Sequence, residues 1–378
     1  MILLVTCFPW DSGQGGPAIL RHWVNRLDAE PIHWFALSRP AEQVPFSEPH
    51  VTCEFHAPPA RGNVRLRLGK FWRWYQRRVW AGQIASLLAR RIEQSKPRLI
   101  WLMADFALAP VGLRLLPALH GQRVHVSIHD DLEPAAQREG ASANFLREVR
   151  EFLSGLREMD LTADAVSEEL LAGILPGAAR SAIVTLPVNT AGCVKAFAGP
   201  RRAGPLTIGF SGNFFGEAEF AVFVEGLRLW SRQSGRDWRL LVFGAARLGA
   251  LDERIVARGF TAADEVRAAL AGCDLLLLPS PLDRPEMRTN LPTKLVSYLE
   301  LGRMIFAFAP EKSSTQRVIA DATLGPVLSS RNASAVAAAL SGLGKWNVAA
   351  AAAGRRRLVE YRFNEDRILQ DLSAAMAG

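Results

Sequence analysis

Residues 286–302, with the sequence EMRTNLPTKLVSYLELG, combine residue types that can bind an anion. They follow the apolar run 273–280, which is typical of a buried strand in a parallel sheet. The pattern predicts a strand, a polar loop and a helix. A helix that starts at the carboxyl end of a strand attracts phosphate through its free backbone N–H groups and its dipole. The cations Arg288 and Lys294 lie in the same stretch.

Capping residues predict the limits of this helix. Asn290 or Thr293 can serve as the N-cap, and Pro292 fits the first turn. Gly302 can adopt the left-handed conformation that ends a helix. The predicted anion site therefore consists mainly of backbone.

A histidine and two acids follow another apolar run. His129, Asp130 and Asp131 come directly after the predicted strand 124–128. At the carboxyl end of a strand, a histidine can contact a substrate. A histidine that is only part of the packed interior fits the sequence equally well. Both interpretations stay open.

Residues 61–80 form a basic and aromatic segment, with seven cations, five aromatic residues and no acid. This composition suits the boundary of an anionic membrane. It is equally compatible with a helix whose rings pack on a sheet and whose Arg side chains face water. Single-stranded nucleic acid is the weakest alternative, because no DNA- or RNA-binding signature accompanies the segment. We expect no nucleic-acid partner.

The elements that must position these residues alternate between strands and helices along the chain. This alternation is typical of α/β proteins, in which helices cover both faces of a parallel sheet and ligands bind at the carboxyl ends of the strands. The predicted strands are 2–6, 32–37, 51–55, 99–103, 124–128, 182–187, 239–243, 274–278, 304–308, a short one before the helix cap Ser167 and one that starts at Leu206; the predicted helices include 17–27, 107–119, 217–233, 247–257 and 263–271.

A chain of 378 residues is too long for one ordinary hydrophobic core and predicts two domains. We expect a Rossmann-like domain over 1–195, a second one over 196–360, and a helix over 361–378 that crosses back to the first. The segment 190–204, rich in Gly, Ala and Arg, is typical of a linker. Two such domains predict a cleft that holds a small molecule.

Bulk composition restricts the class of protein. A hydrophobic content of 49% with 22% charged residues indicates a globular chain, and the formal charge of +8 favours an anionic partner. The widely spaced Cys7, Cys53, Cys193 and Cys273 predict buried free thiols in a reducing cytoplasm. The N-terminus lacks the basic region of a signal peptide, and no stretch reaches the ~18 apolar residues of a membrane span.

Taken in order, the motifs resemble those of a GT-B glycosyltransferase of the retaining, family-four kind. Each motif is only moderately specific, but the series runs along nearly the whole chain. It comprises the first strand with Gly15-Gly16, His129-Asp130, the segments 164–170 and 186–189, Gly209–Gly212, Gly259–Thr261, the segments 266–280 and 292–302, and 361–364 with the tail helix.

This resemblance implies transfer of a sugar from a nucleotide-sugar donor with retention, without a required metal or other cofactor. The first domain would hold the acceptor, with His129 and the adjacent Asp130 at the transferred sugar and the backbone of Gly15 and Gly16 at the reaction centre. The second domain would hold the donor. The implied donor-side residues are Gly212, Asn213, Phe260, Thr261, Arg288, Asn290, Leu291, Pro292, Thr293, Lys294 and Ser297.

Two positions depart from the family pattern. Ser297 stands where the family has a glutamate that binds the ribose, and the loop 213–217 lacks the cations found there in the family. A serine makes one hydrogen bond but cannot bracket two hydroxyl groups as a carboxylate does. The departures motivate a second hypothesis, a catalytically inactive GT-B binding or partner subunit. A sugar-nucleotide epimerase is the third.

The cellular setting is predicted from the same resemblance and from composition. Only six of the 45 basic residues are Lys, which is typical of a GC-rich bacterial genome. We expect a cytoplasmic enzyme of cell-surface polysaccharide or glycolipid assembly, with a glycan or lipid-linked acceptor. Residues 61–80 would hold it at the cytoplasmic face of the membrane.

Overall fold

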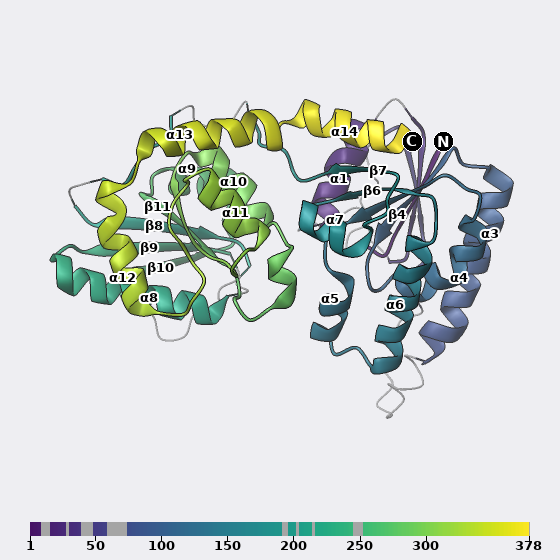
Figure 1. Ribbon diagram of the computed structural model, residues 1–378, viewed down its shortest axis with the longest axis horizontal. Helices are drawn as coiled ribbons and strands as arrows, with labels where there is room; N and C mark the ends of the chain where they lie inside the picture. The colour runs from purple at the N-terminus through teal and green to yellow at the C-terminus, as the bar shows by residue number, and fades with distance from the viewer. Residues whose placement is uncertain are drawn as a thin grey trace. The chain divides into compact units, whose positions relative to one another are not determined.

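The computed structural model describes residues 1–8, 16–27, 30–38, 48–58, 74–190, 196–201, 204–213, 216–244 and 252–377. The chain divides into two compact units (Figure 1). Unit 1 comprises Met1–Leu186 and Ile368–Gly378, and unit 2 comprises Pro187–Arg367. Each unit contains one sheet of parallel strands, so the prediction of an α/β protein with two parallel sheets is confirmed.

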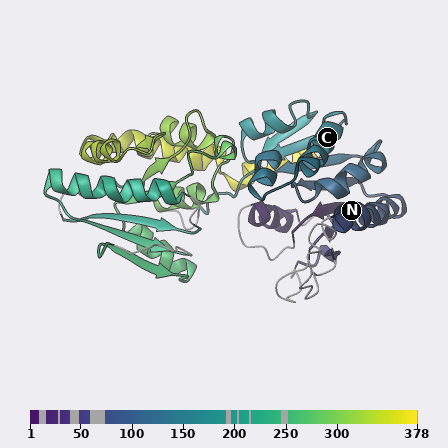
Figure 2. The ribbon, with the colours of Figure 1, turned by 90° about the horizontal axis from the view of Figure 1, so that it is seen from below.

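Unit 1 contains a seven-stranded sheet in the order β3-β2-β1-β4-β5-β6-β7, with helices on both of its faces (Figure 2). Its strands are β1 (Ile2–Thr6), β2 (Ile32–Ala36), β3 (Val51–Phe55), β4 (Leu99–Ala104), β5 (Val124–Ile128), β6 (Thr162–Ala165) and β7 (Arg180–Ile183). Its helices are α1 (Gly16–Arg26), η1 (Gln76–Trp80), α3 (Ala81–Ser95), α4 (Ala109–Leu119), α5 (Leu132–Arg138), α6 (Ala143–Arg157), α7 (Glu168–Ile174) and most of α14 (Glu365–Ala377).

The last helix of the chain completes the core of unit 1. Ile368, Leu372 and Met376 of α14 are buried among the core residues of this unit. The guanidinium of Arg123, just before β5, donates to the carbonyl oxygen of Met376 at 3.1 Å. The two ends of the chain therefore belong to one compact body.

Unit 2 contains a six-stranded parallel sheet in the order β10-β9-β8-β11-β12-β13. Its strands are β8 (Leu206–Ser211), β9 (Trp238–Phe243), β10 (Ile255–Gly259), β11 (Leu275–Pro279), β12 (Met304–Phe308) and β13 (Val327–Leu328). Its helices are α8 (Glu217–Ser234), α9 (Ala263–Ala271), η2 (Pro285–Arg288), α10 (Thr293–Leu301), α11 (Ser314–Asp321), α12 (Ala333–Gly342), η3 (Leu343–Lys345), α13 (Val348–Arg357) and η4 (Leu358–Arg362).

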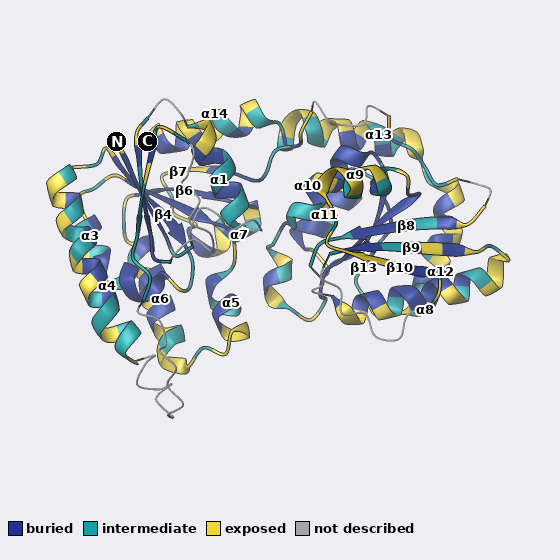
Figure 3. Ribbon diagram, turned by 180° about the vertical axis from the view of Figure 1, so that it is seen from behind, coloured by how far each residue is buried: buried dark blue, intermediate teal, exposed yellow. Residues whose placement is uncertain are grey.

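Burial explains why the central strands are largely apolar. All residues of β1, β4, β5, β11 and β12 are buried, because helices cover the sheets, and the outward sides of those helices are exposed (Figure 3). These strands, with β2, β3 and β8, lie where the sequence predicts them.

Some sequence predictions are wrong. Of the helix predicted over 247–257, residues 247–251 lie outside the described residues, and its end conflicts with strand β10, which starts at Ile255. The strand predicted over 182–187 is β7, which ends at Ile183. β10 lies at the edge of its sheet and only its first residue is buried, so its sequence lacks the apolar run that identifies a strand. Helices α5 and α6 were not predicted.

The cysteine prediction is only partly correct. Cys273 is a buried free thiol, whereas Cys7 and Cys53 are free but only half-buried, and Cys193 lies outside the described residues. Within the described ranges, no helix has both the length and the apolarity that crossing a bilayer requires.

Candidate functional site

The predicted anion site at the start of α10 has a backbone N-terminus without a side-chain cap. The N-cap is Pro292, whose side chain makes no cap hydrogen bond, and the helix ends at Gly302 with φ of 60°. The predictions of Asn290 or Thr293 as N-cap and of Pro292 inside the first turn are therefore wrong. Proline in the N-cap position has no polar side-chain atom, so only its carbonyl oxygen, which accepts from the N–H group of Leu295 at 2.9 Å, serves the first turn.

The first turn of α10 is also the most favourable one for an anion among the helices that follow β8, β10, β11 and β12. α8 and α9 carry two acids each in their first turns, and the first turn of α11 is capped by Ser313, whereas the first turn of α10 has no acid. At the other end, buried Arg355 donates to the carbonyl oxygens of Leu299 at 2.5 Å and Glu300 at 3.2 Å. A cation at the C-terminus complements the helix dipole.

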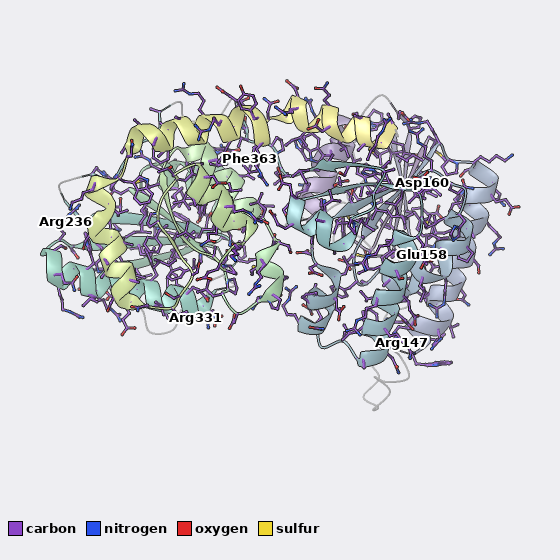
Figure 4. The ribbon with its side chains drawn as sticks, viewed as in Figure 1. Arg147, Glu158, Asp160, Arg236, Arg331 and Phe363 are labelled. Carbon is purple, nitrogen blue, oxygen red and sulfur yellow. The ribbon has the colours of Figure 1, made fainter. Side chains whose placement is uncertain are left out.

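One of the two first-turn acids of α8, Glu219, makes buried structural contacts. The carboxylate of Glu219, which is 1% exposed, accepts hydrogen bonds from Arg331 and from the backbone N–H of Leu282. Arg331, labelled in Figure 4, also lies 2.9 Å from the carboxylate of Asp283. The start of α8 is thus tied to the loop after β11 by a buried carboxylate, which disfavours a phosphate there.

Lys294 brings a cation to the glycine loop that follows β8. Its Nζ donates to the carbonyl oxygen of Asn213 at 2.6 Å and lies 4.7 Å from the centre of the Phe210 ring. Gly212 has a φ of +102°, and a Cβ built on it would lie 2.5 Å from Cε of Lys294. Glycine is therefore required here both by conformation and by the lysine packed against it.

Burial lowers the pKa of Lys294 to about 8. The cause is desolvation of the ammonium beside the Phe210 ring. The side chain remains cationic at neutral pH and becomes increasingly neutral above pH 8. Lys294 thus brings a cation to the loop 213–217, whose own sequence has none.

The other donor-side residues line the same carboxyl edge of the unit 2 sheet. Leu291 is buried, whereas Arg288 is exposed at the end of the turn η2. Phe260 follows edge strand β10 and is 82% exposed, and Thr261 next to it bonds to the carbonyl oxygen of Arg258 at 3.4 Å. An aromatic ring this exposed is free to stack on a planar ligand.

No glutamate of α10 takes the place of the family carboxylate. Ser297 is exposed on the helix, one turn after Lys294. Glu300 is buried and bound instead to structural partners, Arg267 at 2.6 Å and the backbone N–H of Asn189 at 2.8 Å.

Unit 1 contains a second candidate site, a cavity of about 140 Å³ at the carboxyl ends of β4 and β5. Of the predicted residues, Gly16, His129 and Asp130 line it, whereas Gly15 lies outside the described residues. Asp105 and Arg138 line the same cavity and were not predicted as site residues. The only signal for Asp105 in the sequence is its position directly after a strand.

His129 is buried and packed against the start of α1. It is 5% exposed, and a Cβ on Gly16 would lie 2.5 Å from its Nδ1. That Nδ1 has no hydrogen-bond partner among the described residues. Burial lowers the pKa of His129 to about 4, although the carboxylate of Asp164 opposes this shift. The imidazole is therefore neutral at physiological pH and suited to a hydrogen bond rather than to charge pairing.

Asp105 is the second titratable group of the cavity. Burial raises its pKa, while a 2.7 Å hydrogen bond from the backbone N–H of Ala107 opposes the shift. A carboxyl group with a raised pKa beside a neutral histidine can exchange a proton with a bound hydroxyl group.

A polar network lies beneath His129 on the same face of β5. His125 and Ser127 alternate with apolar residues toward His129 and both bond to the carboxylate of Asp164 on β6. The other nitrogen of His125 bonds to Thr162 at 2.8 Å. All four side chains are at most 9% exposed, so this network fixes the strand end that carries His129.

Among the residues the structure describes, no group of three or more His, Cys, Asp and Glu side chains could hold a metal ion.

Part of unit 2 matches a known protein family. Residues 205–345 match the family described as Glycosyl transferases group 1. No curated protein sequence matches the chain. Among solved structures, the chain is similar to the lipopolysaccharide outer core galactosyltransferase WaaB, with 12% identity, a TM-score of 0.66, and coverage of 100% of this chain and 99% of the other.

Two further solved structures are also similar to this chain. The trehalose 6-phosphate synthase from Burkholderia multivorans has 11% identity and a TM-score of 0.63 over 100% of this chain and 98% of its own. LpCGTa in complex with UDP has 12% identity and a TM-score of 0.56, with coverage of 100% and 99%. At sequence identities this low, the similarity shows only that the chain shares the fold of these proteins. The chain as a whole has the GT-B fold, and residues 205–345 of it match the glycosyltransferase group 1 model.

Proposed function

We propose that the protein is a glycosyltransferase that transfers a sugar from a nucleotide-sugar donor to a glycan or lipid-linked acceptor with retention. One observation carries the proposal: within a glycosyltransferase group 1 domain, the uncapped start of α10 and the ammonium of Lys294 lie beside the glycine loop after β8. The helix dipole, the backbone of the helix start and a cation together suit a diphosphate.

In the proposed reaction, these groups stabilise the leaving nucleoside diphosphate. The bond from the sugar to the diphosphate breaks, and negative charge grows on the departing oxygen. N–H donors and an ammonium fixed in advance stabilise that charge where it forms. Phe260 would stack on the base, and Ser297 would offer a single hydrogen bond to the ribose.

On the acceptor side, the unit 1 cavity would bind the sugar or the acceptor hydroxyl. A neutral His129 can donate to or accept from a sugar hydroxyl. Asp105 and Asp130 line the same cavity and could accept a proton from the hydroxyl that forms the new bond. The proposal needs no bound metal or other cofactor.

A transfer assay combined with thermal shifts tests the proposal. Donors with uracil, guanine and adenine bases are offered to the full chain, and nucleoside diphosphate release is measured with glycan and lipid-linked acceptors. Stabilisation by one donor together with its turnover supports a transferase. If no nucleotide sugar or nucleoside diphosphate stabilises the protein, the proposal is wrong.

An inactive GT-B binding or partner subunit is the second candidate. It is favoured by the exposed Ser297 and by Glu300, whose carboxylate is bound to Arg267 and Asn189. It predicts that a donor raises the melting temperature without turnover. A sugar-nucleotide epimerase would instead alter the donor in the absence of any acceptor.

We further propose a peripheral position on the cytoplasmic membrane face, in cell-surface polysaccharide or glycolipid assembly. Of the basic segment 61–80, residues 61–73 lie outside the described residues. Trp74 is 52% exposed, whereas Arg77 bonds to Glu148 and stacks 5.1 Å from the ring of Phe145. Binding to anionic liposomes, but not to neutral ones, would support this. Unchanged binding after the cations of 61–73 are replaced by Gln would contradict it.

A further inference from the structure

Two hydroxyl groups at the start of α11 donate hydrogen bonds to the loop that precedes α10. Ser314 Oγ donates to the carbonyl oxygens of Arg288 at 3.4 Å and Thr289 at 3.3 Å. Thr315 Oγ1 donates to the carbonyl oxygen of Asn290 at 3.2 Å. Three consecutive carbonyl groups therefore point toward α11.

Both hydroxyl-bearing side chains are buried, Ser314 with 2% and Thr315 with 1% exposure. They are not needed to cap α11, because Ser313 accepts a hydrogen bond from the backbone N–H of Gln316 at 3.1 Å. Capping therefore does not explain why hydroxyl groups occupy these two buried positions. Their contacts with the loop do.

The backbone N–H groups of the same loop are also hydrogen-bonded. The backbone N–H groups of Thr289 and Asn290 both donate to the carbonyl oxygen of Glu286, at 3.3 and 3.1 Å. With N–H groups turned to one partner and carbonyl groups to another, these peptide planes cannot rotate without breaking hydrogen bonds. The chain then enters α10, where the N–H group of Leu295 donates to the carbonyl oxygen of the N-cap Pro292 at 2.9 Å and the positive end of the helix dipole faces the loop.

The direction of the carbonyl groups matters for an anion. A carbonyl oxygen is the negative end of the peptide dipole, so a peptide that rotated toward the start of α10 would repel a diphosphate. We propose that Ser314 and Thr315 are positioning residues that hold the carbonyl groups of residues 288–290 away from the donor diphosphate. This inference rests on the function proposed above.

Paired variants of the full chain test the assignment. Thr315→Val removes the hydroxyl group and keeps the side-chain shape, Ser314→Ala removes the other, and Thr315→Ser retains a hydroxyl group. Calorimetry with UDP, GDP and ADP first identifies the diphosphate that the unchanged protein binds. We expect about tenfold weaker binding of that diphosphate by Thr315→Val and by Ser314→Ala, and nearly full affinity in Thr315→Ser. The affinity for the corresponding nucleoside should not change, because it lacks the anion.

Ser341→Ala is the matched control. Ser341 of α12 donates to the carbonyl oxygen of Ala337 within its own helix at 2.9 Å, and its loss should leave diphosphate binding unchanged. Equal diphosphate affinity in Thr315→Val, Ser314→Ala and the unchanged protein overturns the assignment. Equal losses in Thr315→Ser and Thr315→Val also overturn it, because the hydroxyl group would then be irrelevant. If the unchanged protein binds none of the three diphosphates, the proposed function fails first and this assignment fails with it.

Discussion

The ammonium of Lys294 lies 2.6 Å from the carbonyl oxygen of Asn213, so a helix side chain brings a cation to a loop that has none of its own. The two residues are 81 positions apart in the chain. This contact joins the two backbone features of the proposed donor site, the glycine loop after β8 and the start of α10.

Replacing Lys294 by Met should reduce kcat/KM for the donor by roughly thirtyfold, which corresponds to about 2 kcal/mol for a charge-assisted hydrogen bond. Met should pack well beside Phe210, so the melting temperature should not fall. The pH profile gives a second readout. Because the pKa of Lys294 is about 8, the ammonium is present below that pH, and kcat/KM should fall above it.

Lys294→Arg is the control for the pH profile, because a guanidinium keeps its charge throughout this range. Its kcat/KM should show no fall that starts near pH 8. An identical alkaline fall in the Met variant would show that another group causes it.

Replacing Gly16 by Ala should lower transfer activity by about a hundredfold, since a displacement of about 1 Å in a reacting group can have that effect. The new Cβ would lie 2.5 Å from Nδ1 of His129, so the imidazole must move. Gly173→Ala in α7 is the matched helical control, because its Cβ would have no atom within 4 Å. Equal activities of the two variants would contradict a role of His129 at the reaction centre.

Replacing Asp164 by Asn should destabilise the protein by roughly 3 kcal/mol, because it removes the negative charge of the acceptor shared by His125 and Ser127 in a buried network. Urea unfolding followed by circular dichroism measures this. Asp321→Asn, at an exposed position of α11, is the control and should change stability by less than about 0.5 kcal/mol. If Asp164→Asn also lowers the free energy of unfolding by less than about 0.5 kcal/mol, the network contributes little to stability.

Replacing Phe260 by Ala should weaken binding of the nucleoside diphosphate by roughly tenfold, if the exposed ring stacks on the base. The melting temperature should hardly change, because 82% of the side-chain surface is already in water. Trp74→Ala removes another exposed ring, in unit 1, and should not affect this affinity. Unchanged binding in both variants would remove Phe260 from the donor site.

Much of the fold is predictable because the central strands of this architecture are rich in apolar residues. β5, β11 and β12 were placed in the sequence to within one residue at each end. Edge strand β10 is not predicted correctly. Only Ile255 of its residues is buried, so its sequence does not show the apolar pattern of a buried strand. The N-cap of α10 was misplaced because Asn290 is bonded to the turn at Glu286 and to Thr315, which leaves the cap position to Pro292.

The candidate site was predictable only where chemistry follows a strand or starts a helix, as at His129 and at residues 290–294. Contacts between distant segments leave no local pattern. Nothing in the sequence near Lys294 indicates Asn213, and nothing near the loop 288–290 indicates Ser314. Asp105 is a single acid in an apolar surrounding, and only the cavity reveals its relation to His129.

The position of α14 has a consequence for how the protein matures during synthesis. Unit 2 is one continuous segment and is complete once Arg367 has emerged from the ribosome. The core of unit 1 still lacks Ile368, Leu372 and Met376 at that moment, although its strands were made first. Because domains generally fold as units, the second unit should mature before the first. A nascent chain arrested before residue 368 should therefore protect unit 2 from protease while unit 1 is still cleaved.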